Sequence, residues 1–151
     1  MPDHIHVLEE AIKVLSPPQA WCQAEFQATD QKNKEVRAHC AIGGVQAVTR
    51  VYWWFPSKWD ATRFFLDTDK IRDGYKRAEE TAIRYLADES IQRLKKAQKK
   101  GDYCGDAEDL EHMTEEDLVI EYNDNYILGS QKSVLSMFRA ALKKAKADAG
   151  V

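Results

Sequence analysis

The sequence predicts an α+β fold, a single mainly helical domain of five to six helices with a small two-stranded β-hairpin near residues 23–40. Three observations lead to this prediction. Apolar residues recur at helical spacing over most of the chain. The spacing changes to strand-like alternation only between the first and second predicted helices. The chain has 151 residues, of which 44% are hydrophobic, and this suits one domain, residues 1–151, with an apolar core.

Composition and charge narrow the class of protein. The net charge of −3 gives no global reason to expect nucleic acid or an anionic membrane as a partner. The apolar runs are far shorter than the roughly 20 residues of a bilayer span. The start of the chain lacks the basic and apolar stretches of a signal peptide. The odd number of widely spaced cysteines argues against a disulfide framework. We therefore expect a cytoplasmic protein with reduced thiols.

The first elements are a helix and the hairpin. Asp3 is a predicted helix cap, and apolar residues follow it at helical spacing, namely Ile5, Leu8, Ile12 and Leu15. Ser16-Pro17-Pro18 is expected to end this helix, because proline cannot donate a backbone hydrogen bond. Ala24, Phe26 and Ala28 then alternate with polar residues, and Val36, Ala38 and Cys40 do the same after a polar turn.

A second helix is predicted from Ala41. It contains Gly43-Gly44, and glycine costs about 1 kcal/mol per residue in a helix interior. One interpretation is close packing of the helix against the hairpin. The other is a helix N-terminus open to a ligand, with Cys40 beside it. A further short helix is expected after Ser57, where Ser57 and Asp60 fit a variant capping box.

The second half of the chain predicts three helices and a loop. A long helix covers 70–99, with Gly101 after it. Its basic last turns, within Arg93–Lys100, suit the negative end of the helix dipole, and phosphate binding is the alternative. Acidic residues crowd the following segment, so 101–114 is expected to be an acidic loop. Thr114 and Ser130 are predicted to cap two further helices, with a turn at Asn123-Asp124-Asn125 between them.

A Cys-dependent hydrolase or transferase is one candidate activity. Cys40 precedes a predicted helix N-terminus, which lowers a thiol pKa and offers backbone donors to an oxyanion. His112 would be the base, and Asn123 or Asp124 would orient it. No local signature of a known cysteine enzyme surrounds Cys40. No metal and no cofactor is predicted, because the cysteines and His112 lack the paired spacing of zinc ligands.

Binding is the other candidate activity. Nearly half of the aromatic residues lie between Tyr52 and Phe65, including Trp53, Trp54 and Trp59. Such a cluster fills a core or forms a surface for a partner or for self-association. Trp21 is a further candidate, either as a core anchor or as a binding residue. Asn123-Asp124 is a polar pair that packing alone does not require.

Three short motifs stand out: Trp21-Cys22-Gln23, Cys40-Ala41-Ile42-Gly43, and Asn123-Asp124 before the last capped helix. With these motifs the chain resembles an uncharacterised family of short bacterial and phage proteins, a domain of unknown function. The resemblance covers roughly the first 50 and the last 35 residues. It implies a compact α+β domain often encoded near mobile elements, and it brings no known activity or catalytic residue. The middle of the chain looks like an elaboration of this protein's own.

The sequence therefore favours a non-enzymatic interaction or regulatory protein of bacterial or mobile-element origin. Its expected surfaces are the 52–65 aromatic segment and the Asn-Asp turn. The Cys40 enzyme is the alternative. Nucleic-acid binding through Arg93–Lys100 and the C-terminal lysines is a third hypothesis, which predicts a steep dependence on salt.

Overall fold

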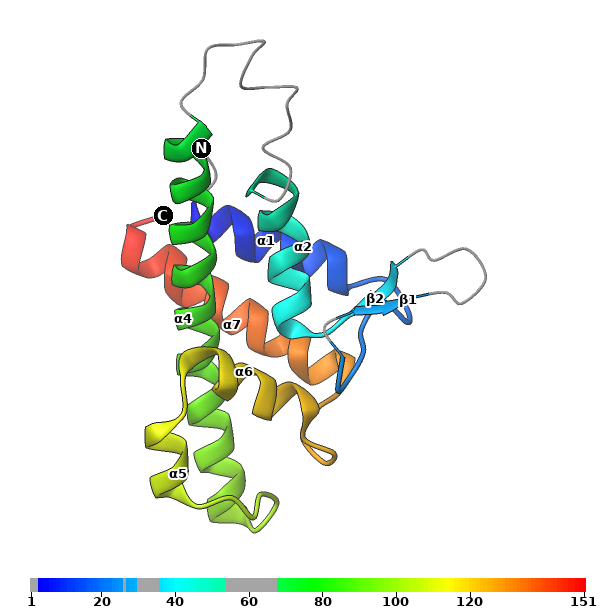
Figure 1. Ribbon diagram of the computed structural model, residues 1–151. Helices are drawn as coiled ribbons and strands as arrows, with labels where there is room; N and C mark the ends of the chain where they lie inside the picture. The colour runs from blue at the N-terminus through cyan, green and yellow to red at the C-terminus, as the bar shows by residue number, and fades with distance from the viewer. Residues whose placement is uncertain (1–2, 26, 30–35, 54–67) are drawn as a thin grey trace.

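One long helix, α4 (Thr68–Lys100), forms the axis of the molecule. It has 33 residues and is therefore about 50 Å long at the helical rise per residue. The computed structural model describes residues 3–25, 27–29, 36–53 and 68–151. Helices α1 (His4–Leu15), α2 (Ala41–Trp53), α6 (Glu115–Asp124) and α7 (Gln131–Ala149) all pack against α4 (Figure 1). With α5 (Ala107–His112), the described residues form one mainly helical domain of six helices, as predicted.

Most helices begin at the residues that the sequence predicts. The Asp3 side chain accepts a hydrogen bond from the backbone N–H of His6 at 3.0 Å and caps α1. Thr114 caps α6 in the same way, by accepting from the backbone N–H of Asp117. Ser130 and Ser133 form a reciprocal capping box at the start of α7. These caps confirm the predicted starts, and Gly101, with a φ of 80°, ends α4 as expected.

The β structure is small. Strand β1 (Gln27–Thr29) pairs antiparallel with β2 (Val36–His39), with Ala28 opposite Ala38. Residues 30–35 between the strands lie outside the described residues. The predicted strand from Ala24 is shortened, because Ala24 has a φ of 62° and this left-handed conformation breaks an extended strand. The other edge of β2 pairs with Trp21: the Cys22 N–H donates to the His39 carbonyl, and the His39 N–H donates to the Ala20 carbonyl.

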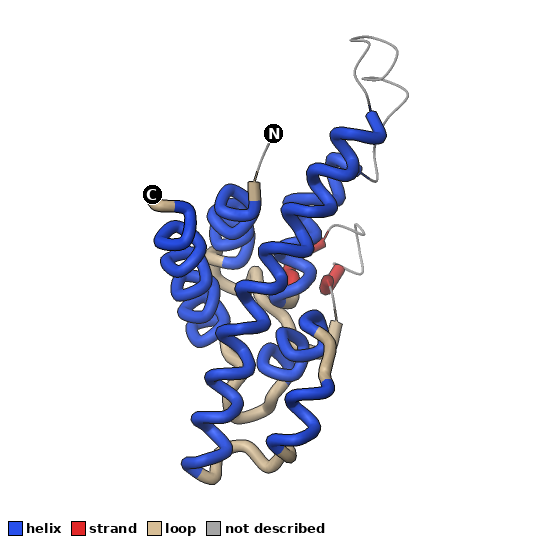
Figure 2. The backbone as a smooth tube through the Cα atoms, turned by 90° about the vertical axis from the view of Figure 1, so that its left-hand side faces the viewer, coloured by secondary structure: helices blue, strands red, loops and turns tan. Residues whose placement is uncertain are grey.

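The core lies where α4 meets the other helices. Its largest fully buried side chains include Leu8 and Leu15 of α1, Ile42 and Val45 of α2, Leu86 and Leu94 of α4, and Phe138 of α7. Helices α1 and α7 also pack side by side along α4, as Figure 2 shows. No helix among the described residues is both long and apolar enough to cross a membrane.

Glycine 44 allows α1 and α2 to approach each other closely. A Cβ atom at this position would lie 2.9 Å from the Leu15 side chain, closer than side-chain atoms normally pack. The predicted close packing therefore occurs at Gly44, but its partner is α1 rather than the predicted hairpin. The reason is that Leu15 is the last residue of α1 and is completely buried there.

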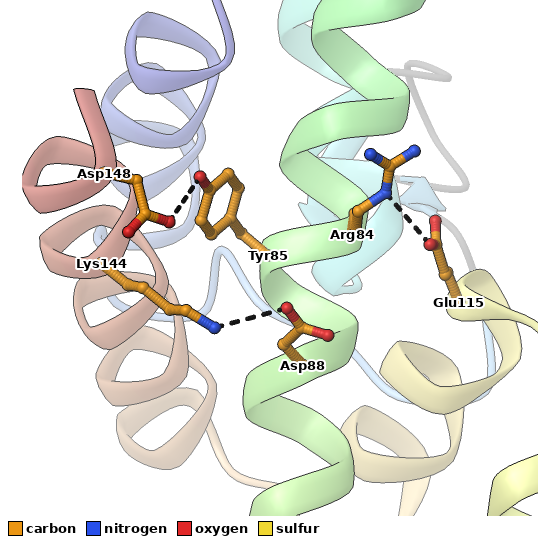
Figure 3. Close-up of polar contacts among 6 residues, drawn as sticks. All are labelled: Arg84, Tyr85, Asp88, Glu115, Lys144 and Asp148. Carbon is orange, nitrogen blue, oxygen red and sulfur yellow. Dashed lines mark hydrogen bonds and ion pairs between the residues drawn. The ribbon is translucent and has the colours of Figure 1, made fainter.

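Polar contacts at the surface of α4 join it to α7 and to α6 (Figure 3). Tyr85 donates a hydrogen bond to Asp148 at 2.8 Å, and Lys144 lies 3.5 Å from Asp88, so both contacts connect α4 to α7. On another side, Arg84 lies 3.3 Å from Glu115 at the start of α6. Exposed pairs of this kind contribute little stability individually. The packing of α4 therefore depends mainly on its apolar face.

The prediction of an acidic loop over 101–114 is wrong for part of the segment. Its residues 107–112 form helix α5, which Asp106 caps by accepting from the backbone N–H of Glu108. Acidic residues in a first helical turn are stabilised by the positive end of the helix dipole. Leu110 is completely buried and anchors α5. The short helix predicted after Ser57 lies outside the described residues.

We predict that Gly44→Val lowers the free energy of unfolding by about 1–3 kcal/mol, because its side chain overlaps Leu15. Urea denaturation measures this. Ala47→Val, on the same helix, shows the cost of introducing a valine that lowers helix propensity, whereas Gly44→Val raises it, so a larger loss at Gly44 reports the overlap. In a Leu15→Ala background the cost of Gly44→Val should fall, because the overlapping atoms are gone. Equal costs for the two valine variants would contradict the close approach of α1 and α2.

Candidate functional site

The side chain of Asn123 is the centre of a buried hydrogen-bond network. Only 1% of this residue is exposed, although it is polar and lies in the last turn of α6. Its Oδ1 accepts from the indole Nε1 of Trp21 at 2.8 Å and from the backbone N–H of Ala41 at 3.0 Å. Its Nδ2 donates to the carbonyl of Cys22 at 3.2 Å and to Asp124 Oδ1 at 2.7 Å. All four hydrogen-bonding positions of the amide are therefore used.

This network brings the three sequence motifs together. Trp21 and Cys22 come from the segment before β1, Ala41 is the first residue of α2, and Asn123 lies in the last turn of α6. The backbone N–H groups in the first turn of a helix have no partner within the helix. Asn123 supplies an acceptor to the Ala41 N–H from a distant part of the chain, so it caps α2. The predicted role of Asn123 in a turn between helices is wrong, because Asn123 and Asp124 both belong to α6.

Gln23 extends the network to the end of α6. Its Nε2 lies 2.9 Å from the carbonyl oxygen of Asn123, and it also contacts the carbonyls of Asn125 and Gly129. The last carbonyls of a helix need donors from outside the helix, and Gln23 provides one. A side chain on Gly129 would overlap the Asn123 carbonyl and the Gln23 amide, so only glycine fits there. Asp124 Oδ1 accepts in addition from the Ala24 N–H at 3.0 Å.

A small pocket of about 140 Å³ opens beside this network. Cys40, Asn123 and Asp124 line it, together with Ala24, Glu25, Ile42 and Ile120. The structure therefore brings together three of the four residues predicted to be catalytic. His112 does not line the pocket; it is the exposed last residue of α5, a helix that packs against α4. Asn123 also has no hydrogen-bonding position left with which to orient a histidine.

The two thiols near the pocket favour their protonated forms. Burial raises the pKa of Cys22 to about 11, and the neighbouring Cys40 adds to this effect. Burial also raises the pKa of Cys40 and outweighs the Gly43 N–H, which lies 3.3 Å from Sγ. The expectation of a lowered pKa for Cys40 is therefore wrong, although the backbone N–H groups at the start of α2 do act in that direction. The adjacent His39 is half-buried, and its burial lowers its pKa, so it favours the neutral form.

Of the four tryptophans predicted to be binding residues, only Trp21 has a described side chain. Trp21 is half-buried and donates to Asn123, so its indole belongs to the network. Trp53 is the last residue of α2, and its side chain lies outside the part of the structure that is described. Trp54 and Trp59, with most of the 52–65 segment, lie outside the described residues. Among the described residues, no group of three or more His, Cys, Asp or Glu is arranged to hold a metal ion.

The loop between α6 and α7 has an exposed apolar tip that the sequence does not predict. The Asn125 side chain accepts from the backbone N–H groups of Ile127 and Leu128, both at 3.0 Å, and fixes a tight turn. Tyr126 is 95% exposed and Ile127 is 71% exposed at the tip of this turn. The asparagine and glycine of 125–129 signal a turn, but no sequence pattern shows that two large apolar side chains point to solvent there.

The chain belongs to a family of unknown function, DUF6197, whose model matches residues 1–144. This confirms the resemblance drawn from the three motifs. The match also includes the middle of the chain, which the resemblance had left as an elaboration of this protein. No curated protein and no solved structure matches the chain significantly.

We predict that Asn123→Ala lowers the free energy of unfolding by about 2–4 kcal/mol, because it leaves the half-buried Trp21 indole and the buried Ala41 N–H without an acceptor. Urea denaturation measures the loss. Asn125→Ala, which removes only the turn contacts of 125–129, should cost about 1 kcal/mol. Equal losses for the two variants would show that Asn123 is not the central residue of the network.

We predict that iodoacetamide modifies the exposed Cys104 well before Cys22 and Cys40 at neutral pH. The thiolate is the reactive form, and the raised pKa values keep it scarce at the half-buried Cys22 and the buried Cys40. The rate at Cys22 should rise steadily with pH toward about 11. Peptide mass spectrometry at several times and pH values gives each rate. A Cys40 that reacts first would contradict this and restore the hydrolase hypothesis.

Proposed function

We propose that this protein is a non-enzymatic interaction or regulatory protein that binds a protein partner through the loop between α6 and α7. The observation that carries the proposal is the exposure of Tyr126 and Ile127 on this loop, 95% and 71%. Burying two such side chains against a partner removes apolar surface from water, and this favours binding. Tyrosine in particular is frequent among the residues that dominate binding energy.

The loop is held in one conformation before any partner arrives. Asn125 fixes its turn from within, and the backbone N–H of Gly129 donates to the Asn125 carbonyl at 2.8 Å. Gln23 contacts the carbonyls at both ends of the loop, Asn125 and Gly129. A surface that is ordered in advance loses less conformational entropy on binding. The hydrogen bonds around the Asn-Asp motif thus support a role in presenting Tyr126 and Ile127.

The 52–65 aromatic segment is the second proposed surface, for a protein partner or for self-association. Its residues Trp53, Trp54 and Trp59 enter the proposal through the sequence alone. A bacterial or mobile-element origin and a cytoplasmic location belong to the same proposal, the location because the three cysteines are free. Nucleic acid is not the proposed partner, since the net charge is −3. A membrane is not proposed either.

A Cys-dependent hydrolase or transferase is the second candidate. The pocket that joins Cys40 to Asn123 and Asp124 favours it. Three observations weigh against it: the raised pKa of the Cys40 thiol, the fully used amide of Asn123, and the position of His112 on α5. A nucleophilic cysteine needs a base within hydrogen-bond reach, and none of the described residues lining the pocket is a histidine.

We predict that a photoreactive benzoylphenylalanine in place of Tyr126 captures one discrete protein in the native cell. The same residue in place of the exposed Lys143 of α7 is the matched control and should not capture it. Purified partner should then bind Tyr126→Ser/Ile127→Ser about tenfold or more weakly than the unmodified chain by calorimetry. The thermal stability of this variant should be unchanged, because both side chains are exposed. Identical capture from both positions would overturn the proposal.

A further inference from the structure

An open groove of about 470 Å³ runs along the C-terminal half of α4, beside the loop between α6 and α7. Basic residues of α4, Arg93, Lys96 and Lys100, line one part of it. Ala97 of α4, Tyr122 of α6 and Leu128 of the loop line another part. The volume lies within the usual range of small-molecule sites. The groove thus combines positive charge with apolar surface in one cavity.

Lys96 and Lys100 are the cations of this groove that lack partners. They are one helical turn apart, so they share a face of α4. Within the described part of the chain, neither ammonium group has an ion pair or a hydrogen bond, whereas Lys95 next to them pairs with Glu111. Like charges one turn apart repel each other. An anion placed between the two lysines would replace this repulsion by two attractions.

Arg93 forms a fixed wall of the groove. Its Nε lies 3.7 Å from Glu89, and its terminal nitrogens lie 3.4 Å from Tyr122 Oη and 3.3 Å from Ser136 Oγ. Its guanidinium carbon is 5.8 Å from the centre of the Tyr122 ring. These contacts hold the planar guanidinium in place, and such a group can also stack on the planar body of a ligand.

Glu89 and Asp102 also line the groove, and their negative charge reduces the net positive charge of the site. Glu89 is already paired with Arg93, so it does not compete for the lysines. Asp102 is exposed beyond the end of α4 and lies more than 4 Å from any cationic nitrogen of the described residues. The negative end of the α4 dipole also lies here and offsets part of one lysine charge. Positive charge therefore remains at Lys96 and Lys100.

We propose that this groove binds a small organic anion. Its phosphate or carboxylate group lies between Lys96 and Lys100, and its planar or apolar body covers Ala97, Tyr122 and Leu128. A purely electrostatic role for the lysines at the helix end explains their charge but not the apolar surface beside them. The proposal is independent of the partner surface, because Tyr126 and Ile127 do not line the groove.

Nuclear magnetic resonance of the isotopically labelled chain tests this at low ionic strength. The probes are adenosine monophosphate and naphthoate, which combine a charge with a planar body, and adenosine and inorganic phosphate, which each lack one of the two. At least one of the combined probes should shift the backbone resonances of Ala97, Tyr122 and Leu128. Adenosine or phosphate alone should bind about tenfold more weakly, because each uses only part of the groove.

Matched variants locate the charge. Lys96→Gln/Lys100→Gln should weaken binding of the combined probe about tenfold. Lys99→Gln/Lys143→Gln removes the same charge from exposed positions outside the groove and should leave binding within about twofold. Tyr126→Ser/Ile127→Ser should bind the probe as the unmodified chain does. The proposal is overturned if neither combined probe shifts these resonances, or if the two lysine pairs have equal effects. A tetraglutamate peptide that shifts them while both small probes fail would also overturn it and assign the groove to an acidic polypeptide.

Discussion

The side-chain amide of Asn123 is the contact on which the arrangement of this chain depends. A buried amide must have its donors and acceptors paired, because each unpaired group costs about 1–3 kcal/mol. Here one amide meets that requirement by joining three segments that are distant in the sequence: the turn before β1, the start of α2 and the end of α6. The apolar face of α4 holds the helices together, but packing alone does not fix how these three ends meet. The amide fixes that geometry, since its bonds are directional.

This constraint separates the structural and the functional parts of the protein. A network whose members are all paired cannot easily move a proton or release a donor to a substrate, because each step would leave a buried group unpaired. The same network is well suited to hold nearby surface in place. Gln23 contacts the carbonyls of both Asn123 and Gly129, and Gly129 packs closely against Asn123 and Gln23. These contacts connect the network to the loop that carries Tyr126 and Ile127. The motif residues therefore act mainly inside the fold, while the exposed side chains next to them form the proposed binding surface.

The helices were predictable from the sequence because their signals are local. Asp3, Thr114 and Ser130 cap helices through bonds to residues three positions away, and such bonds can be predicted from the order of the residues. The short strands and α5 were harder to predict. Ala24 breaks the longer predicted strand through a left-handed backbone that few sequences reveal, and α5 depends on the burial of one residue, Leu110, within an acidic segment. The partner of Gly44 is also a tertiary fact, because Leu15 lies in another helix.

Three of the four residues proposed for the candidate site do lie at one pocket, His112 does not, and the chemistry of the site was not predictable. The sequence drew attention to Cys40, Asn123 and Asp124, and the structure places all three at one pocket. It could not show that burial would outweigh the helix N-terminus at the Cys40 thiol, because desolvation depends on every neighbour of the sulfur. The groove on α4 was hidden for a similar reason. Its two lysines, Lys96 and Lys100, are only four positions apart in the sequence, but Tyr122 and Leu128 reach the groove only through the fold, and without them a basic helix end has no surface on which a ligand could lie.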